Sequence, residues 1–203
     1  AEKPFCLWLN FSDPHHVWNA PASDRPDPAS LKLPAHWPDL PGMREQLADY
    51  CAEVNRFDRS MAAVLALLAE KGFAANTLVI FAGDNGAALP HGKGSLYDPG
   101  SNVPLVIRWP GVIKPGTIYN DIFSQEDWMP TLLAAAGEPD IVAKMKQGYK
   151  ANGKSFKVHL DGYNFLPYLE GKEKKGPRSD FYYFSDDGKF LGVRDGDWKL
   201  VFA

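Results

Sequence analysis

Hydrophobic residues divide the chain into a few expected elements. The apolar run at 4–11, the β-branched run at 77–82 and the proline-bracketed run at 104–110 each indicate a strand buried on both faces. Over 43–71, apolar residues recur at spacings of three and four, which predicts a long amphipathic helix, and a shorter helix is expected at 127–136. Strands and helices in this order predict an α/β fold with a mostly parallel sheet flanked by helices.

The long predicted helix has two distinct faces. We expect its apolar stripe to pack into the core, with no cofactor role. The opposite face is polar and carries Arg44, Glu45, Asp49, Glu53, Arg56 and Arg59.

Two other parts of the chain depart from the strand and helix pattern. Residues 20–42 contain six prolines, which exclude regular structure and are typical of a long loop that covers or forms part of a site. Residues 181–184 and 190–202 are expected to form short antiparallel strands, with turns between them. We therefore expect an α/β core at 1–170 and a small antiparallel unit at 171–203.

Composition narrows the classes of function. The chain has 203 residues, of which 45% are hydrophobic, and a formal net charge of −3. It has neither the basic excess of a nucleic-acid binder nor an apolar run near the ~20 residues of a membrane span. Two distant cysteines, Cys6 and Cys51, decide neither a disulfide nor a compartment. The chain starts without Met and enters an apolar run almost at once, so we expect a portion of a longer protein.

Polar residues follow the first two predicted strands. Ligands bind outside the carboxyl ends of parallel strands, so we expect 13–16 and Asp84-Asn85 to share one edge of the sheet. Asp84 and Asn85 offer hard oxygen ligands for Ca²⁺ or Mg²⁺, with a simple Asx turn as the alternative. His15 is a candidate general acid, because imidazole exchanges protons near neutrality; a hydrogen-bonded turn residue is the alternative. Lys93, between two glycines, offers a positive charge for an oxyanion or is a solvated loop lysine.

A phosphate-binding pattern at 148–155 does not predict nucleotide binding. Gly, four residues and Gly-Lys-Ser form that loop only between a buried strand and a helix. Here the preceding residues 143–147 are too polar for a central strand, and residues 156–160 alternate like a strand.

The order of the motifs resembles that of the type I sulfatases over nearly all of the chain. The matching segments are 11–15 (Phe-Ser-Asp-Pro-His), 78–86, 92–97, 103–111, 127–133, 159–162 and 193–200. The resemblance implies an alkaline-phosphatase-like fold, a Ca²⁺ (sometimes Mg²⁺) and a formylglycine made from Cys or Ser. It also implies a sulfated small molecule or sulfated glycan as substrate and a periplasmic, secreted or lysosomal location. From the composition, we expect no nucleic-acid or membrane partner.

Individual roles follow from the same resemblance. Asp84 and Asn85 match two metal ligands, His15 matches the histidine near the leaving-group oxygen, and Lys93 matches the lysine that binds the sulfate. Whether His15 or His16 faces the site stays open. The family's maturation motif, Cys or Ser followed by x-Pro/Ala-x-Arg, is missing. In the family it lies in the N-terminal half, so we expect a C-terminal portion that is inactive alone and has the missing half as its partner.

Three alternatives remain within this resemblance. Residues 97–100 (Tyr-Asp-Pro-Gly) are similar to the heparan N-sulfatase branch. That branch carries Arg where Lys93 stands here, so O-sulfate and N-sulfate substrates both stay open. A phosphatase or phosphodiesterase of the same superfamily and a non-catalytic carbohydrate-binding relative are the others.

Overall fold

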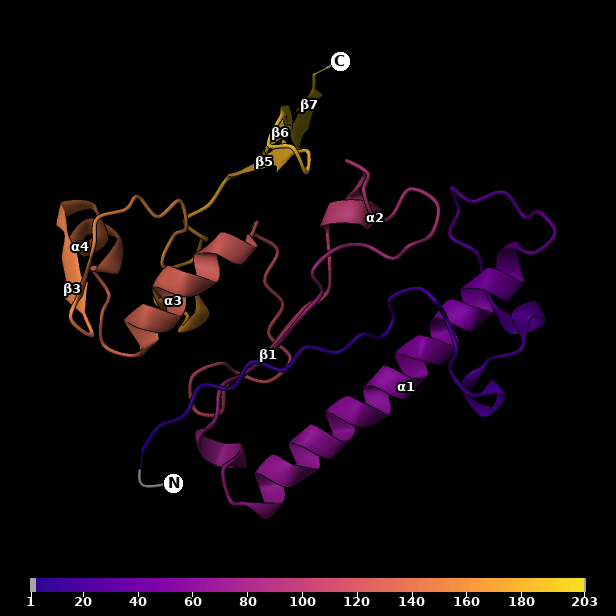
Figure 1. The fold of residues 1–203 in the computed structure, drawn as a ribbon, viewed down its shortest axis with the longest axis horizontal. Coiled ribbons are helices and arrows are strands. Elements are labelled where there is room, and N and C mark those ends of the chain that lie inside the picture. The colour runs from indigo at the N-terminus through magenta and orange to yellow at the C-terminus, as the bar shows by residue number, and fades with distance from the viewer. Residues whose placement is uncertain (1–2, 203) are drawn as a thin grey trace. The chain divides into compact units, whose positions relative to one another are not determined.

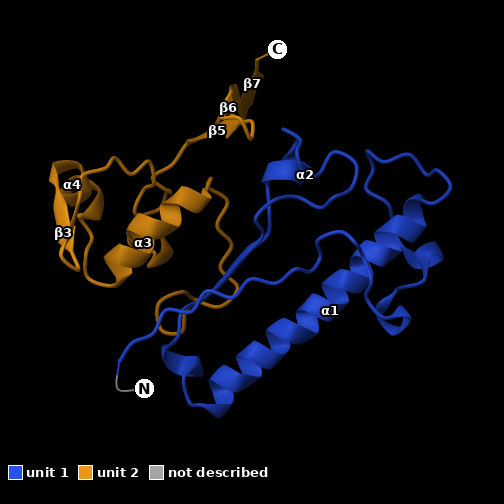
Figure 2. Cartoon of the chain, in the orientation of Figure 1, with its two compact units in different colours: residues 1–107 blue, residues 108–203 orange. Residues whose placement is uncertain are grey.

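The computed structural model describes residues 3–202. The chain divides into two compact units, residues 1–107 and residues 108–203 (Figure 2). The expected boundary between 170 and 171 lies inside the second unit, and the division into a core and a C-terminal subdomain stays a prediction.

The long helix is the dominant element of the first unit (Figure 1). The elements of this unit are η1 (Ala22–Asp24), η2 (Pro28–Ser30), α1 (Met43–Glu70), η3 (Ala74–Asn76), β1 (Val79–Ala82), α2 (Asp98–Ser101) and β2 (Leu105–Arg108), which extends one residue past its end. The helix predicted at 43–71 is thus confirmed. It ends before Gly72, whose φ of 74° is the left-handed conformation of a helix C-terminus. Within residues 3–202, no helix combines the length and apolarity that a membrane crossing requires.

The apolar stripe of α1 is less deeply buried than expected. The fully buried residues of the helix are Ala48, Ala52 and Glu53, while the larger stripe side chains are half-buried or exposed. Two of the three buried positions are alanines and the third is a charged residue from the polar face. Close packing against this helix is therefore concentrated at its middle.

The strand predicted at 4–11 is wrong for this structure. The segment has no regular secondary structure, and side chains such as Leu7 and Trp8 are 67% and 80% exposed. An apolar run becomes a buried strand only when neighbouring strands hydrogen-bond to it and other elements cover both faces. Among residues 3–202 it has no strand partner, and although Phe5 and Phe11 contact the rings of Phe73 and Phe57, side chains such as Leu7 and Trp8 are left exposed.

The predicted mostly parallel sheet is likewise not shown. Strands β1 and β2 form a two-stranded sheet. The N–H of Gly83, just after β1, donates to the carbonyl of Pro104, just before β2, so the end of one strand meets the beginning of the other. A parallel sheet would need several neighbouring strands that run in the same direction, whereas every strand pair whose register is defined within the described residues is antiparallel.

The second unit combines short helices with two antiparallel sheets. Its elements after β2 are η4 (Gln125–Asp127), α3 (Trp128–Ala135), α4 (Ile141–Gln147), β3 (Tyr149–Ala151), β4 (Lys154–Phe156), α5 (Leu166–Leu169), β5 (Asp180–Phe184), β6 (Phe190–Asp195) and β7 (Trp198–Val201). The helix predicted at 127–136 is confirmed by α3. The predicted C-terminal strands are confirmed as an antiparallel sheet of order β5-β6-β7.

The phosphate-loop pattern at 148–155 forms a hairpin. Strand β3 pairs antiparallel with β4, and the turn between them places Asn152 and Gly153 at positive φ. Such a turn is typical of a two-residue hairpin connection. No helix follows it, so the geometry that cradles phosphate is missing, as the sequence predicted.

A buried ion pair holds the second unit together. Asp127 is fully buried, and its two oxygens accept hydrogen bonds of 2.8 Å from Nε and Nη2 of Arg178. The same carboxylate accepts the backbone N–H groups of Ser124 and Tyr163 at 2.8 and 2.7 Å. Four donors on one carboxylate compensate its lost hydration, so this pair ties η4, the 161–163 segment and the chain before β5 to one point.

A second charged cluster, the Glu53 clamp, holds the loop 13–20 onto α1 in the first unit. Fully buried Glu53 accepts the N–H groups of Asn19 and Ala20 with Oε1, each at 2.6 Å. Arg56 donates to Glu53 Oε2 at 2.6 Å and to both oxygens of Asp13 at 2.6 and 2.7 Å. It also donates to Asn19 Oδ1 at 2.9 Å. Both ends of the loop are therefore fixed to neighbouring turns of one helix.

The clamp has a defined pH range. The hydrogen bond from Arg56, more than any other contact, holds the pKa of the Asp13 carboxyl below its ordinary value of 3.8. Because the folded pKa is the lower one, the stability from this pair is fully present above pH 3.8. It is lost as the pH falls through the folded value.

We expect Glu53→Ala to destabilise the protein by about 3 kcal/mol, because it leaves the N–H groups of Asn19 and Ala20 without their acceptor and removes one of the two carboxylates bonded to Arg56. The free energy of unfolding in urea measures this change, and the amides of Asn19 and Ala20 should exchange hydrogen faster. Glu70→Ala is the matched control, since it removes a carboxylate of the same helix from an exposed pair with Lys71 and should cost under about 1 kcal/mol. Equal losses in the two variants would contradict the clamp.

Candidate functional site

His15 has a fixed tautomer in the clamped loop. Its Nδ1 lies 2.5 Å from the backbone carbonyl oxygen of His16. A carbonyl only accepts hydrogen bonds, so Nδ1 carries the proton and Nε2 is the atom left to exchange one with a bound molecule. The His15 N–H also donates to Ser12 O at 2.7 Å, which closes the turn beneath the ring. A histidine oriented in this way through Nδ1 suits a general acid acting through Nε2.

His16 occupies a different environment. Its ring meets Trp18 edge to face, with centroids 5.2 Å apart. Together with Trp18 and Ala88 it lines a cavity of about 360 Å³. His16 is therefore part of a cavity wall, whereas His15 does not line that cavity.

Asp84 and Asn85 follow β1 in a tight turn. Asp84 Oδ1 accepts the N–H of Asn85 at 2.9 Å, and Asn85 Nδ2 donates to the carbonyl of Gly86 at 2.9 Å. The first bond joins neighbouring residues, whereas an Asx turn bonds the N–H two residues on, so it does not form the Asx turn that was the alternative, and metal binding by this pair stays a prediction. This geometry is compatible with metal binding, because both residues are exposed. The second bond uses the amide nitrogen of Asn85, so its amide oxygen is available as a metal ligand.

The glycine-rich segment 86–100 folds back on itself beside this turn. A Cβ on Gly86 would lie 1.9 Å from the carbonyl oxygen of Pro99, and one on Gly92 would lie 2.1 Å from that of Ala87. Only glycine permits such close approaches of backbone to backbone. The Lys93 N–H donates to Ala87 O at 2.8 Å, which fixes the Lys93 backbone next to Ala88 and leaves its side chain exposed.

The proline-rich loop contacts the glycine-rich segment, and its part in a site stays a prediction. Trp37 Nε1 donates to Pro90 O at 3.0 Å. The His36 ring lies 5.9 Å from that of His91, which in turn meets Tyr97 edge to face at 4.8 Å. Ring contacts therefore connect the proline-rich loop to His91 and Tyr97, which lie before and after Lys93 in the sequence.

None of the predicted site residues His15, Asp84, Asn85 and Lys93 lines the cavity, and their joint site stays a prediction. The clamped loop and the segment that follows Asp84 and Asn85 meet around one cavity, through His16 and Ala88. Between residues 3 and 202, no hydrogen bond or ion pair joins the side chains of His15, Asp84, Asn85 and Lys93 to one another, and no cluster of three acidic, histidine or cysteine ligands occurs. Sequence reasoning missed Glu53 and Arg56; their spacing of three on a helix was the available signal.

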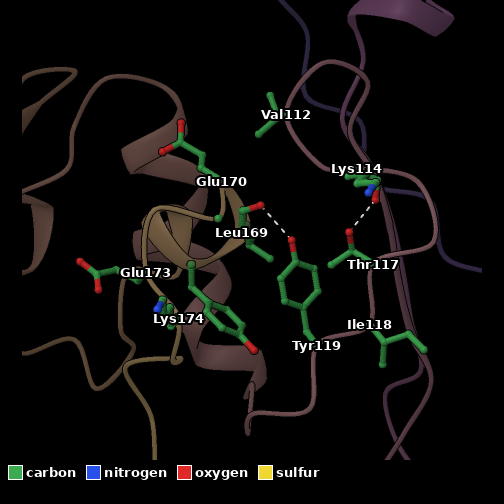
Figure 3. A pocket seen from close by; sticks show the side chains of 11 residues that line it. Val112, Lys114, Thr117, Ile118, Tyr119, Leu169, Glu170, Glu173 and Lys174 are labelled. Carbon is green, nitrogen blue, oxygen red and sulfur yellow. Dashed lines mark hydrogen bonds between the residues drawn. The ribbon is translucent and has the colours of Figure 1, made fainter.

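A second cavity lies within the second unit and contains none of the predicted site residues. It measures about 320 Å³, between the 112–119 segment and the end of α5. Figure 3 shows the Tyr119 hydroxyl donating to the Leu169 carbonyl, at 2.8 Å. Burial first, and then the hydrogen bond and charge of Asp121, raise the pKa of Tyr168 to about 12. This tyrosine therefore stays protonated at neutral pH and is a wall residue rather than a base.

Comparison with known proteins gives a consistent result. The family model described as Sulfatase matches residues 1–138. An ulvan-active sulfatase of Formosa agariphila is 29% identical over 199 residues, which cover 96% of this chain and 31% of that protein. N-sulphoglucosamine sulphohydrolase of Homo sapiens is 30% identical over 198 residues, which cover 84% and 38%. The chain thus spans about a third of the length of these curated relatives.

Solved structures show the same fold. A Bacteroides thetaiotaomicron protein connected with the metabolism of multiple glycosaminoglycans has a TM-score of 0.60 at 21% identity, covering 76% of this chain and 33% of that one. A phosphonate monoester hydrolase from Silicibacter pomeroyi has a TM-score of 0.60 at 24% identity, covering 87% and 37%. These likenesses confirm the expected sulfatase and alkaline-phosphatase-like fold. Because the family model covers more than half of the chain, the protein belongs to the sulfatase family.

Proposed function

We propose that this chain is the C-terminal portion of a sulfuric-ester hydrolase and carries part of the sulfate and metal site without the nucleophile. The match of the sulfatase model to residues 1–138 is the observation that carries the proposal. The chain spans about a third of the relatives' length, which supports the proposal that it is a portion without the nucleophile. So does the sequence, in which neither Cys nor Ser is followed by x-Pro/Ala-x-Arg.

The reaction proposed is net hydrolysis of a sulfate ester. Water oxygen becomes bonded to sulfur, the bond from sulfur to the organic oxygen breaks, and that oxygen receives a proton, which gives an alcohol and hydrogen sulfate. Nε2 of His15 supplies the proton, since Nδ1 is committed to the His16 carbonyl. Lys93 holds a sulfuryl oxygen through its ammonium group, which is exposed on a backbone that glycines fix in place.

Asp84 and Asn85 would hold a Ca²⁺ or Mg²⁺ as two of its oxygen ligands. The donor set fits these hard cations, but Ca²⁺ takes six to eight oxygens, so the other ligands belong to the partner half and to water. When bound, the cation disperses negative charge on the sulfuryl oxygens. A formylglycine in the partner half supplies the nucleophile.

Other functions of this site have weaker support. The human N-sulphoglucosamine sulphohydrolase is 30% identical, which favours a sulfated glycan and keeps an N-sulfate substrate as the second candidate. Lys93 in place of Arg argues for an O-sulfate. A phosphatase or phosphodiesterase would use more metal-binding His and Asp than the single Asp84-Asn85 pair. A periplasmic, secreted or lysosomal location remains our proposal for the whole protein.

The first test is activity. The full-length enzyme should hydrolyse p-nitrophenyl sulfate, and the purified 203-residue chain should not, because it has no residue placed to act as nucleophile. Release of nitrophenolate measures both. If the 203-residue chain still turns over substrate after repurification, the proposal that it lacks the nucleophile is rejected. A full-length protein that cleaves no sulfate ester, yet cleaves a phosphate monoester or diester, would reject the proposed function.

The second test is metal binding by the full-length enzyme. Asp84→Ala should weaken Ca²⁺ binding by at least roughly 10-fold. Removal of a residue that only hydrogen-bonds to a metal ligand already costs about that much, and loss of a ligand itself should cost more. Calorimetric titration of the metal-free protein measures the change. Asp187→Ala is the matched control, because Asp187 is an exposed turn carboxylate between β5 and β6. If both variants bind Ca²⁺ like the wild type, the Asp84-Asn85 pair is only a turn.

The third test separates His15 from His16. A departing alkoxide needs a proton, whereas nitrophenolate, a weak base, hardly needs one. His15→Ala should therefore slow hydrolysis of methyl sulfate by roughly 10²–10⁴-fold and that of p-nitrophenyl sulfate much less. His16→Ala should slow the two substrates alike, because His16 lines a cavity wall. Values of kcat/KM for both substrates decide the matter: equal slowing by His15→Ala sinks the acid role, and unequal slowing by His16→Ala alone assigns it to His16.

A further inference from the structure

The cavity beside the clamped loop is built from three segments of the first unit. The loop contributes His16, Val17 and Trp18, helix α1 contributes Gln46 and Asp49, and the glycine-rich segment contributes Ala88, around a volume of about 360 Å³. Small-molecule sites occupy about 300–1,000 Å³, so this cavity suits a ligand of one ring rather than several.

Trp18 is the fixed wall of the cavity. Its ring is half-buried and lies edge to face against His16 and against Tyr50 of α1, at centroid distances of 5.2 and 6.0 Å. Its Nε1 donates to Pro14 O at 3.2 Å. The clamp fixes the chain on both sides of it, at Asp13 and at Asn19. An indole held in this way is ready to contact a ligand without losing rotamer freedom on binding.

The polar part of the wall offers hydrogen bonds without a positive charge. Asp49 is held by Arg25, whose Nε donates to Oδ1 at 2.5 Å, and the Gln46 amide has no hydrogen-bond partner among residues 3–202. Neither Lys nor Arg lines the cavity. Hydroxyl and amide groups of a ligand can therefore bond to Gln46 and Asp49. A ligand carboxylate would lose hydration without a lining cation to pair with, because Arg25 does not line the cavity and is already paired with Asp49.

The position of the cavity relates it to the proposed reaction. His16 follows His15 directly, and Ala88 follows Ala87, to whose carbonyl the Lys93 N–H is bonded. The cavity wall therefore adjoins, along the chain, the residues proposed to protonate the leaving oxygen and to hold the sulfate.

We propose that the cavity binds the leaving group of the substrate and that this group is an uncharged pyranose, such as a hexose or N-acetylhexosamine, rather than a uronate. The indole of Trp18 packs against the apolar face of the sugar, and Gln46 and Asp49 bind its hydroxyl or amide groups. This inference rests on the proposed function for the ligand's role in the reaction. Binding of the unsulfated sugar itself depends only on the cavity.

The experiment measures sugar binding directly in the full-length enzyme. Saturation-transfer NMR and calorimetry with methyl β-N-acetylglucosaminide and methyl β-glucuronide give affinities that require no nucleophile. The uncharged glycoside should bind at least about tenfold more tightly than the glucuronide. Trp18→Ala should weaken its binding about tenfold, as expected for loss of one aromatic contact. Trp198→Ala, which removes an indole that is 84% exposed in the second unit, should change nothing.

A second variant guards against a folding defect in Trp18→Ala. Gln46 is exposed on α1, so Gln46→Ala leaves the fold intact and should weaken the glycoside about two- to tenfold through one lost hydrogen bond. Wild-type affinity in both cavity variants, or equal binding of glycoside and glucuronide, overturns the inference. Hydrolysis of sulfate esters without these binding effects leaves the proposed function standing. Sugar binding that Trp18→Ala and Gln46→Ala weaken, without any hydrolysis, supports the cavity and rejects the enzyme.

Discussion

The carboxylate of Glu53 is the constraint on which the first unit depends. A charged group with no exposed surface is stable only if several donors surround it, and here Asn19, Ala20 and Arg56 provide them. Those donors exist in the right place only when the loop 13–20 lies on α1. Any other position of the loop would leave the buried charge of Glu53 without these donors, so the loop is held in this one position. Arg56 fixes the other end of the loop in the same way, through its bond to Asp13.

The two halves of the candidate site are ordered by different physics. Side-chain charge orders the histidine loop, whereas backbone sterics order the glycine-rich segment, where Gly86 and Gly92 permit carbonyl oxygens to approach as no other residue would. The first kind of order depends on pH and on salt, because it rests on ionised groups. The second depends on neither. The position of Lys93 is consequently less sensitive to solvent than that of His15.

Features set by neighbours in sequence were predictable, and features set by distant partners were not. Helix α1 and the sheet β5-β6-β7 follow from local periodicity and turn residues, so the sequence sufficed for them. The run at 4–11 has the composition of a central strand, but burial needs partners that residues 3–202 do not supply. Glu53 was placed on the polar face of the helix, and its burial was not predicted, because helical periodicity gives only the direction of a side chain. The loop that covers it comes from more than thirty residues earlier.

The candidate site was predictable to the same extent. Asp84, Asn85 and Lys93 were identified by their position after a strand and between glycines, and the structure assigns them a tight turn and a fixed backbone. The roles of the two histidines could not be separated in the sequence, because the separation depends on one hydrogen bond, from His15 Nδ1 to the His16 carbonyl. That bond leaves Nε2 as the ring nitrogen of His15 through which the proposed acid would act, and no such bond within the described residues orients the His16 ring. Trp18 lies in the same clamped loop, so any change in Glu53 or Arg56 shifts the proposed acid and the cavity wall together. The Lys93 backbone stays where the glycines hold it. A change in the clamp therefore moves His15 and Trp18 together and leaves Lys93 in place, because charge orders the histidine loop and backbone sterics order the glycine-rich segment.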